Sequence, residues 1–152
     1  MAYKWGKHMI VRKAHAAWKG TLMDGRGVLS VGPEMTDRLF DRESRFGDGR
    51  GVNPEEMIGA ALAGCFCMAL SHAIEQAGYH PDGIEAAAEV MLDEDQPEIN
   101  SIRLKTTGSI PDLSQDEFNR LAQQTASSCP VARALASTEI TVETAMLTPT
   151  GT

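Results

Sequence analysis

The sequence has little cysteine and no excess of positive charge. Its 152 residues contain three cysteines, an odd number that is too small for a disulfide-stapled secreted scaffold. We therefore expect a reducing, cytoplasmic setting, in which the thiols that matter are catalytic, redox-active or metal-binding. The formal net charge of −7 argues against nucleic acid and against an anionic membrane as partners.

Long hydrophobic runs are also missing. No continuous apolar stretch approaches the roughly 18 residues needed to span a bilayer, so we expect no membrane partner. The first 20 residues, "MAYKWGKHMIVRKAHAAWKG", have no continuous apolar core and do not indicate a secretory signal. The size and the 42% share of hydrophobic residues predict one globular domain over residues 1–152.

Turn signals divide the first 50 residues into short segments. "DGRG", "VGPE" and "GDGRG" separate strand candidates such as 10–18 and 28–31, which is typical of an antiparallel meander. A long helix is predicted over residues 54–77, with Asn53 as N-cap and Gly78 as the C-terminal stop. Because "MIGAALAGCFCMAL" is apolar on most sides, we expect this helix to be buried.

The second half predicts two more helices and three more strands. Ser114 and Glu117 form a capping-box pattern for a helix to about Ala126, and Cys129-Pro130 begins a short helix to about Ala136. The predicted strands cover residues 84–92, 99–108 and 139–147. The complete order predicts an α+β fold with helices packed against antiparallel sheets.

The cysteines raise the question of which two could work together. Cys65 and Cys67 are two residues apart on the long helix, so their side chains point to nearly opposite faces, about 200° apart. We interpret Cys67 as a small buried hydrophobic residue. Cys65 and Cys129 remain, either as a functional pair or as two inert core cysteines. From local sequence alone, Cys129 is the more acidic thiol, because it lies at a helix N-terminus.

Small residues gather around the middle of the long helix and permit a close helix partner. If the partner is the same helix of a second subunit, crossing antiparallel near residue 60, Glu55 of one subunit lies near Cys65 of the other. Within one chain the two are about 15 Å apart along the helix. The alternative is that Glu55 only complements the helix dipole.

Two segments together are similar to a known family. "SRFGDGRGVNPEEMIGAALAGCFCMAL" and the distant "SSCPVARAL" resemble the OsmC family (osmotically inducible protein C), which belongs with the organic hydroperoxide resistance proteins to a superfamily of thiol-dependent peroxidases. The resemblance extends over nearly the whole chain. It implies an intertwined α+β homodimer with long central helices and active sites shared across the interface.

The resemblance also implies roles for individual residues. Cys65 is the peroxidatic cysteine, Cys129 the resolving one, Arg45 the catalytic arginine and Glu55 its carboxylate partner. This reverses the local preference for Cys129 as the attacking thiol. A free thiol, with a pKa of about 8.5, is only a few per cent ionised at neutral pH, and a nearby guanidinium favours the thiolate.

The implied activity is reduction of organic hydroperoxides to alcohols, in defence against oxidative and osmotic stress. No cofactor or metal is expected, and the Cys65–Cys129 disulfide is reduced by a dithiol, for which the superfamily suggests a dihydrolipoyl group. We expect Phe46 and Phe66 to line an apolar substrate pocket. Phe66, like Met57, Ile58 and Met68, could equally belong to the core.

Two features depart from the family pattern. Cys67 stands where the family has a small residue, and we expect no catalytic role for it. His72 shares a helix face with Cys65 but lies about 10 Å further along the axis. Two alternatives remain: a metal-binding or redox-sensing protein that uses Cys65, Cys129 and His72, and a non-catalytic dimeric binding module on the same fold. No Cys-x-x-Cys or His-x-x-x-His spacing supports the metal alternative.

Overall fold

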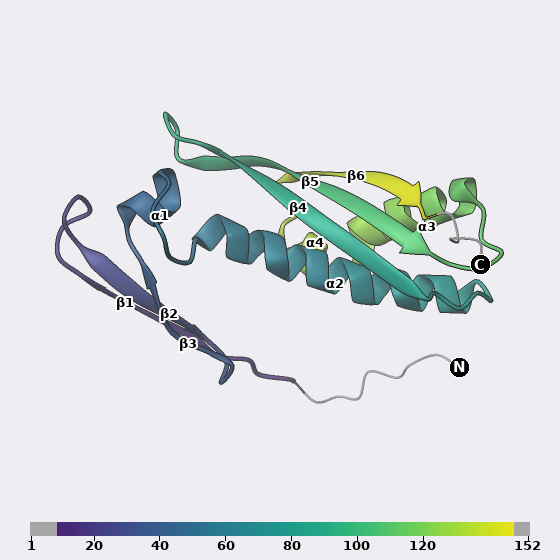
Figure 1. Ribbon diagram of the computed structural model, residues 1–152, viewed down its shortest axis with the longest axis horizontal. Helices are drawn as coiled ribbons and strands as arrows, with labels where there is room; N and C mark the ends of the chain where they lie inside the picture. Colours follow the sequence, from purple (N-terminus) through teal and green to yellow (C-terminus); the bar gives the residue numbers. More distant parts are fainter. Residues whose placement is uncertain (1–8, 148–152) are drawn as a thin grey trace. The chain divides into compact units, whose positions relative to one another are not determined.

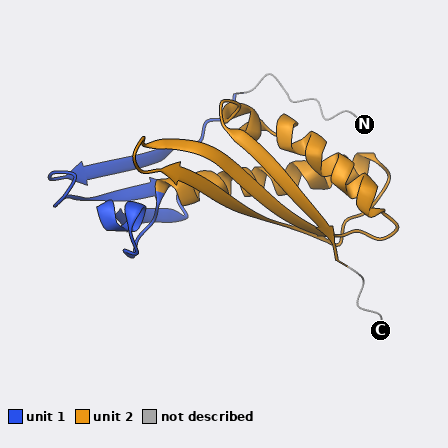
Figure 2. Ribbon diagram, turned by 90° about the horizontal axis from the view of Figure 1, so that it is seen from above, with its two compact units in different colours: residues 1–53 blue, residues 54–152 orange. Residues whose placement is uncertain are grey.

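The computed structural model describes residues 9–147, which confirm the α+β class (Figure 1). The chain divides into two compact units, residues 1–53 and 54–152 (Figure 2). The prediction of one domain over residues 1–152 is not tested by this division and stays a prediction.

The first unit contains the predicted antiparallel meander. Strands β1 (Ala14–Lys19), β2 (Arg26–Val31) and β3 (Met35–Phe40) pair in that order. The ring centres of Trp18 and Phe40 lie 5.4 Å apart across the sheet. Gly27 lies beneath the Phe40 ring, where an added Cβ would come within 2.5 Å of the ring. Only glycine therefore fits beneath the Phe40 ring without displacing it.

This first sheet buries little apolar surface. All six residues of β1 are exposed, and so are Val31 of β2 and Leu39 of β3. Large hydrophobic side chains next to the strands are exposed as well: Ile10, Val11, Leu22 and Met23. Three strands need a hydrophobic face packed against something to be stable. The described part of the chain leaves much of that face open.

A short helix, α1 (Arg42–Phe46), follows the meander and was not predicted. Asp41 caps it by accepting a hydrogen bond from the Ser44 N–H at 2.8 Å, and the Ser44 hydroxyl accepts one from the Asp41 N–H at 2.9 Å. This reciprocal capping box satisfies two backbone donors. It fixes the helix that carries Arg45.

The second unit begins with the long helix α2 (Pro54–Gln76), within one residue of the prediction. It ends before Gly78, whose φ of +93° is a conformation that glycine adopts without strain. One side of α2 is buried every four residues, at Leu62, Phe66, Leu70 and Ile74.

The opposite side of α2 is exposed in this chain. Ala60, Gly64, Met68 and His72 lie on it, and Met68 is 78% exposed. The expectation of a helix buried all round is therefore wrong for a single chain, because sheet and helices cover only one of its faces. We call these four residues the α2 stripe.

Helix α2 is also long and apolar enough to cross a membrane, with a mean hydropathy of 1.8 over its most apolar window. The sequence prediction considered only uninterrupted apolar residues and missed this. Length and composition do not separate a membrane span from the core helix of a soluble protein, which passes the same test.

The sheet of the second unit contains β4 (Gly83–Asp93), β5 (Glu98–Ser109) and β6 (Glu139–Met146), in that order. All three strands match their predicted ranges closely. β4 and β5 are antiparallel, but β5 and β6 are parallel, with Ile102 opposite Ile140. The expectation of wholly antiparallel sheets is wrong at this pair, because the intervening helices carry the chain back to the start of β5.

Those intervening helices are α3 (Gln115–Ser128) and α4 (Pro130–Ala134), both near their predicted positions. Ser114 caps α3 by accepting a hydrogen bond from the Glu117 N–H at 3.2 Å. Helix α2 packs on β4 and on both shorter helices, and α3 packs on β6. The helices cover one face of the sheet (Figure 2), and the core lies between these layers.

Candidate active site

Cys65 and Cys129 come together where α2 packs on α4. Both are free thiols; Cys65 is half-buried, and only 1% of the surface of Cys129 is exposed. Burial raises the pKa of the Cys129 thiol most, and a hydrogen bond with Cys65 and the charge of Cys65 raise it further. The two sulfurs, 64 positions apart in the sequence, are thus neighbours in the fold.

Cys129 is the N-cap of α4, as the sequence predicts. Its sulfur accepts a hydrogen bond from the Ala132 N–H at 3.4 Å. The N–H groups of Ala132 and Val131 lower the pKa of Cys129, but burial outweighs them and the net direction is upward. The local sequence favoured Cys129 as the more acidic thiol because of its helix N-terminus, but the pKa of Cys129 is raised, because burial, on which the local sequence carries no information, outweighs the helix.

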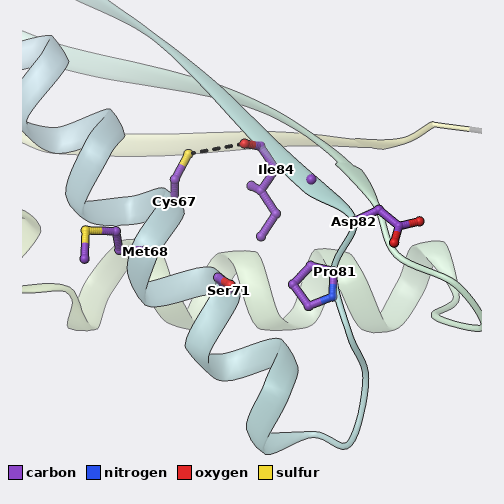
Figure 3. A pocket seen from close by; sticks show the side chains of 7 residues that line it. Cys67, Met68, Ser71, Pro81, Asp82 and Ile84 are labelled. Carbon is purple, nitrogen blue, oxygen red and sulfur yellow. Dashed lines mark hydrogen bonds between the residues drawn. The ribbon is translucent and has the colours of Figure 1, made fainter.

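Cys67 points the other way, towards β4 (Figure 3). Its S–H donates a hydrogen bond to the Ile84 carbonyl at 3.9 Å. It lines an open groove of about 460 Å³ whose other residues are Met68, Ser71, Pro81, Asp82, Gly83 and Ile84. Burial, and then the charge of Glu85, raise the pKa of Cys67. Cys65 and Cys67 thus lie on different faces of α2, as the helix geometry predicts.

Arg45 and Phe46 form the end of α1 in the first unit. The guanidinium of Arg45 lies over the ring of Phe46, 5.1 Å from its centre, in a cation–π contact. The side-chain amide of Asn53 donates hydrogen bonds to the carbonyls of Ser44 and Arg45, at 3.0 and 3.2 Å. These contacts fix the helix end that carries Arg45. The pairing of Arg45 with Cys65, which belongs to the second unit, stays a prediction.

The other two predicted site residues lie on α2. Glu55 is in the first turn and is only 6% exposed, an uncommon position for a carboxylate. Its predicted role beside Arg45 stays a prediction. Phe66 is fully buried in the core cluster with Leu62 and Leu70, which favours the core alternative for this residue. Phe46 is half-buried and remains the better candidate for lining a pocket.

The predicted metal alternative finds little support in the described residues. Within 9–147, no three His, Cys, Asp or Glu side chains gather so that they could hold a metal ion. His72 is exposed on the α2 stripe, whereas Cys129 is buried, so these two proposed ligands lie in different environments. His8 lies outside the described residues.

The sequence matches the model of the OsmC-like protein family over residues 47–145. Peroxiredoxin OsmC of Escherichia coli is 35% identical over 137 residues, which cover 88% of this chain and 95% of that protein. The chain belongs to the OsmC-like protein family. The resemblance predicted from the two cysteine segments is confirmed.

Solved structures share the fold of this OsmC-like protein. An OsmC-like protein from Mycoplasma pneumoniae gives a TM-score of 0.70 at 13% identity and covers 91% of this chain and 99% of its own. The organic hydroperoxide resistance protein OhrB of Bacillus subtilis gives a TM-score of 0.64 at 21% identity. The matched region covers 88% of this chain and 98% of the OhrB chain. At these identities the likeness establishes the fold.

Two structural features next to the predicted residues escaped the sequence predictions for this OsmC-like protein. The first is α1, which is only five residues long; the Asp41-x-x-Ser44 pattern before Arg45 was the available signal. The second is the groove at Cys67, whose far wall comes from the turn before β4. No local signal could have revealed that wall, since it depends on how β4 packs on α2.

Proposed function

We propose that this protein is a thiol-dependent peroxidase that reduces organic hydroperoxides to alcohols and uses Cys65 and Cys129 as its redox pair. The neighbouring Cys65 and Cys129 sulfurs at the α2–α4 contact are the observation that carries the proposal. Two relatives support it by their names, Peroxiredoxin OsmC and the organic hydroperoxide resistance protein OhrB.

In the first step the Cys65 thiolate attacks the terminal oxygen of the hydroperoxide. The O–O bond breaks, the alkoxide leaves with the bonding electrons and takes up a proton, and Cys65 is oxidised to sulfenic acid. The guanidinium of Arg45 stabilises the thiolate and donates to the oxygen on which negative charge develops. Glu55 holds Arg45 through a charge-assisted hydrogen bond.

In the second step Cys129 resolves the sulfenic acid. Its sulfur attacks the Cys65 sulfur, water leaves, and a disulfide forms. A dithiol then returns both cysteines to thiols by exchange. A dihydrolipoyl group is the reductant we expect, in the reducing environment of the cytoplasm.

The active enzyme is proposed to be a homodimer with sites shared between subunits. Two exposed apolar surfaces support this: the α2 stripe and the open face of the first sheet. Soluble proteins rarely leave such surfaces uncovered. Light scattering should give a dimer for the natural protein and a monomer for Met68→Glu. Leu147→Glu, the same kind of change at an exposed residue directly after β6, is the control.

The deciding experiment is mass spectrometry after one equivalent of cumene hydroperoxide. A Cys65–Cys129 crosslink should form in the natural protein and in Cys67→Ser. Cys129→Ser should instead accumulate sulfenic acid at Cys65, detected with dimedone. A crosslink through Cys67, or no oxidation of Cys65, contradicts the proposal. Metal analysis of the purified protein tests the metal-binding alternative in parallel.

A further inference from the structure

The two sulfurs of the candidate pair differ in access. Cys129 is 1% exposed and is enclosed by the end of α3 and the start of α4. Its N–H donates a hydrogen bond to the Thr125 carbonyl at 3.0 Å, and its sulfur accepts one from the Ala132 N–H. Thr125 and Ala132 are themselves buried, at 3% and 4% exposure. Cys65, one side of which packs on the core, keeps part of its surface exposed.

This difference matters for the reductive half of the cycle. In thiol–disulfide exchange the incoming thiolate must reach the sulfur that it attacks, and the other sulfur leaves. A buried sulfur is therefore a poor target and can only be the leaving group. Resting on the proposed function, we infer that the reducing dithiol attacks the Cys65 sulfur of the disulfide and that Cys129 is the leaving group.

The exchange then balances in two steps. One thiolate of the dithiol forms a bond to the Cys65 sulfur, the Cys65–Cys129 bond breaks, and Cys129 leaves with both bonding electrons. The second thiol of the dithiol, once deprotonated, attacks the first and expels the Cys65 thiolate. The dithiol is oxidised to a disulfide by two electrons, and both protein cysteines are reduced.

The surroundings of Cys129 suit a leaving group that does not attack the mixed disulfide once it has left. The Ala132 N–H lies at 3.4 Å from the departing sulfur and can stabilise its negative charge as the bond breaks. Burial keeps the pKa of the free Cys129 thiol above its ordinary range, so at neutral pH the sulfur takes up a proton. A protonated thiol is a poor nucleophile. The mixed disulfide on Cys65 therefore persists until the second thiol of the dithiol resolves it.

The test uses a monothiol, which has no second thiol to resolve the mixed disulfide intramolecularly, so the adduct can be trapped at short times. The Cys67→Ser protein is oxidised with one equivalent of cumene hydroperoxide and treated with 2-mercaptoethanol. It is quenched at short times with N-ethylmaleimide in urea, in which the Cys129 thiol is accessible, and analysed by peptide mass spectrometry. We expect mercaptoethanol on Cys65 and maleimide on Cys129, with about tenfold less of the reverse pattern. Predominant mercaptoethanol on Cys129, or an equal split, overturns the inference.

The same experiment separates this inference from the proposed function. If cumene hydroperoxide forms no Cys65–Cys129 disulfide, the proposed function fails before the monothiol is added. If the disulfide forms and the adduct lies on Cys129, only the inference fails.

A second measurement compares access directly in two single-cysteine proteins. The Cys67→Ser/Cys129→Ser protein retains Cys65, and Cys65→Ser/Cys67→Ser retains Cys129. The Cys65 thiol should react with a neutral aromatic disulfide about tenfold faster than the Cys129 thiol. The difference should vanish in urea, where both are accessible. Equal rates in the folded proteins contradict the inference.

Discussion

The sulfur of Cys129 accepts a hydrogen bond from the backbone N–H of Ala132, 3.4 Å away, at the first turn of α4. The same sulfur adjoins Cys65 and is almost completely buried. Its environment therefore combines two opposed effects. Helix N–H groups favour the thiolate, and exclusion of water favours the thiol.

The pH dependence of disulfide formation follows from the balance between them. Burial raises the pKa of Cys129, so the thiolate that attacks the sulfenic acid is a minor species at neutral pH. Below that pKa the thiolate fraction grows about tenfold per pH unit. Stopped-flow measurement of crosslinking after a pulse of cumene hydroperoxide should show the rate rising with pH from about 6 to about 8. A flat profile contradicts this role of Cys129.

Replacing Cys67 should leave turnover intact. Its sulfur faces the groove beside Ile84, on another face of α2 from the one that packs on Cys129. A serine hydroxyl can also donate to the Ile84 carbonyl, so we expect Cys67→Ser to alter stability by less than about 1 kcal/mol. Peroxide-dependent oxidation of a dithiol should stay within about twofold of the natural rate. Cys65→Ser, a change on another face of the same helix, should abolish the peroxide-dependent oxidation of the dithiol.

Two arginines on the same short helix provide a matched pair. Arg45→Ala should lower turnover by about a hundredfold, because it removes the donor proposed to stabilise developing negative charge. Arg42 forms an exposed ion pair with Glu43 at 3.0 Å, and Arg42→Ala should change turnover little. Circular dichroism should show both variants folded. Equal turnover in the two variants would remove Arg45 from the mechanism.

Two serines of α3 test the packing that encloses Cys129. Ser114 caps the helix by accepting from the Glu117 N–H, so Ser114→Ala should lower the free energy of unfolding by about 1 kcal/mol. The hydroxyl of Ser127 donates to the Gln124 carbonyl on the exposed side of the last turn, and Ser127→Ala should have little effect. Urea titration measures both. A larger loss in Ser127→Ala would contradict this account of α3.

Local signals predicted most of the helices and strands. Pro54 and Gly78 bracket α2, Ser114 begins α3, and Cys129-Pro130 begins α4, because a cap involves only residues within one turn. The parallel pairing of β6 could not be predicted in this way. It depends on which edge of β5 is free and on the path of the helices before β6, both of which are non-local.

In the candidate site, too, local features were predicted from the sequence and non-local features were not. Helix rotation alone separated Cys65 from Cys67, and the N-cap position of Cys129 followed from its proline neighbour. The sequence did not predict that the pKa of Cys129 is raised, because its burial depends on how α2 and α3 pack around it. Phe66 lies in the buried core cluster, which favours the core alternative over a pocket wall, and the sequence could not decide between the two because an apolar pattern does not distinguish a core from a pocket.

The parallel β5–β6 pair has a consequence for the oxidised protein. Cys129 lies in the crossover that joins these two strands, so a bond from it to α2 would tie this crossover to the long helix. The resulting covalent ring of more than 60 residues would contain β4 and β5 and would restrict the unfolded chain by about 4 kcal/mol. Each catalytic cycle would therefore pass through a temporarily stapled and more protease-resistant form.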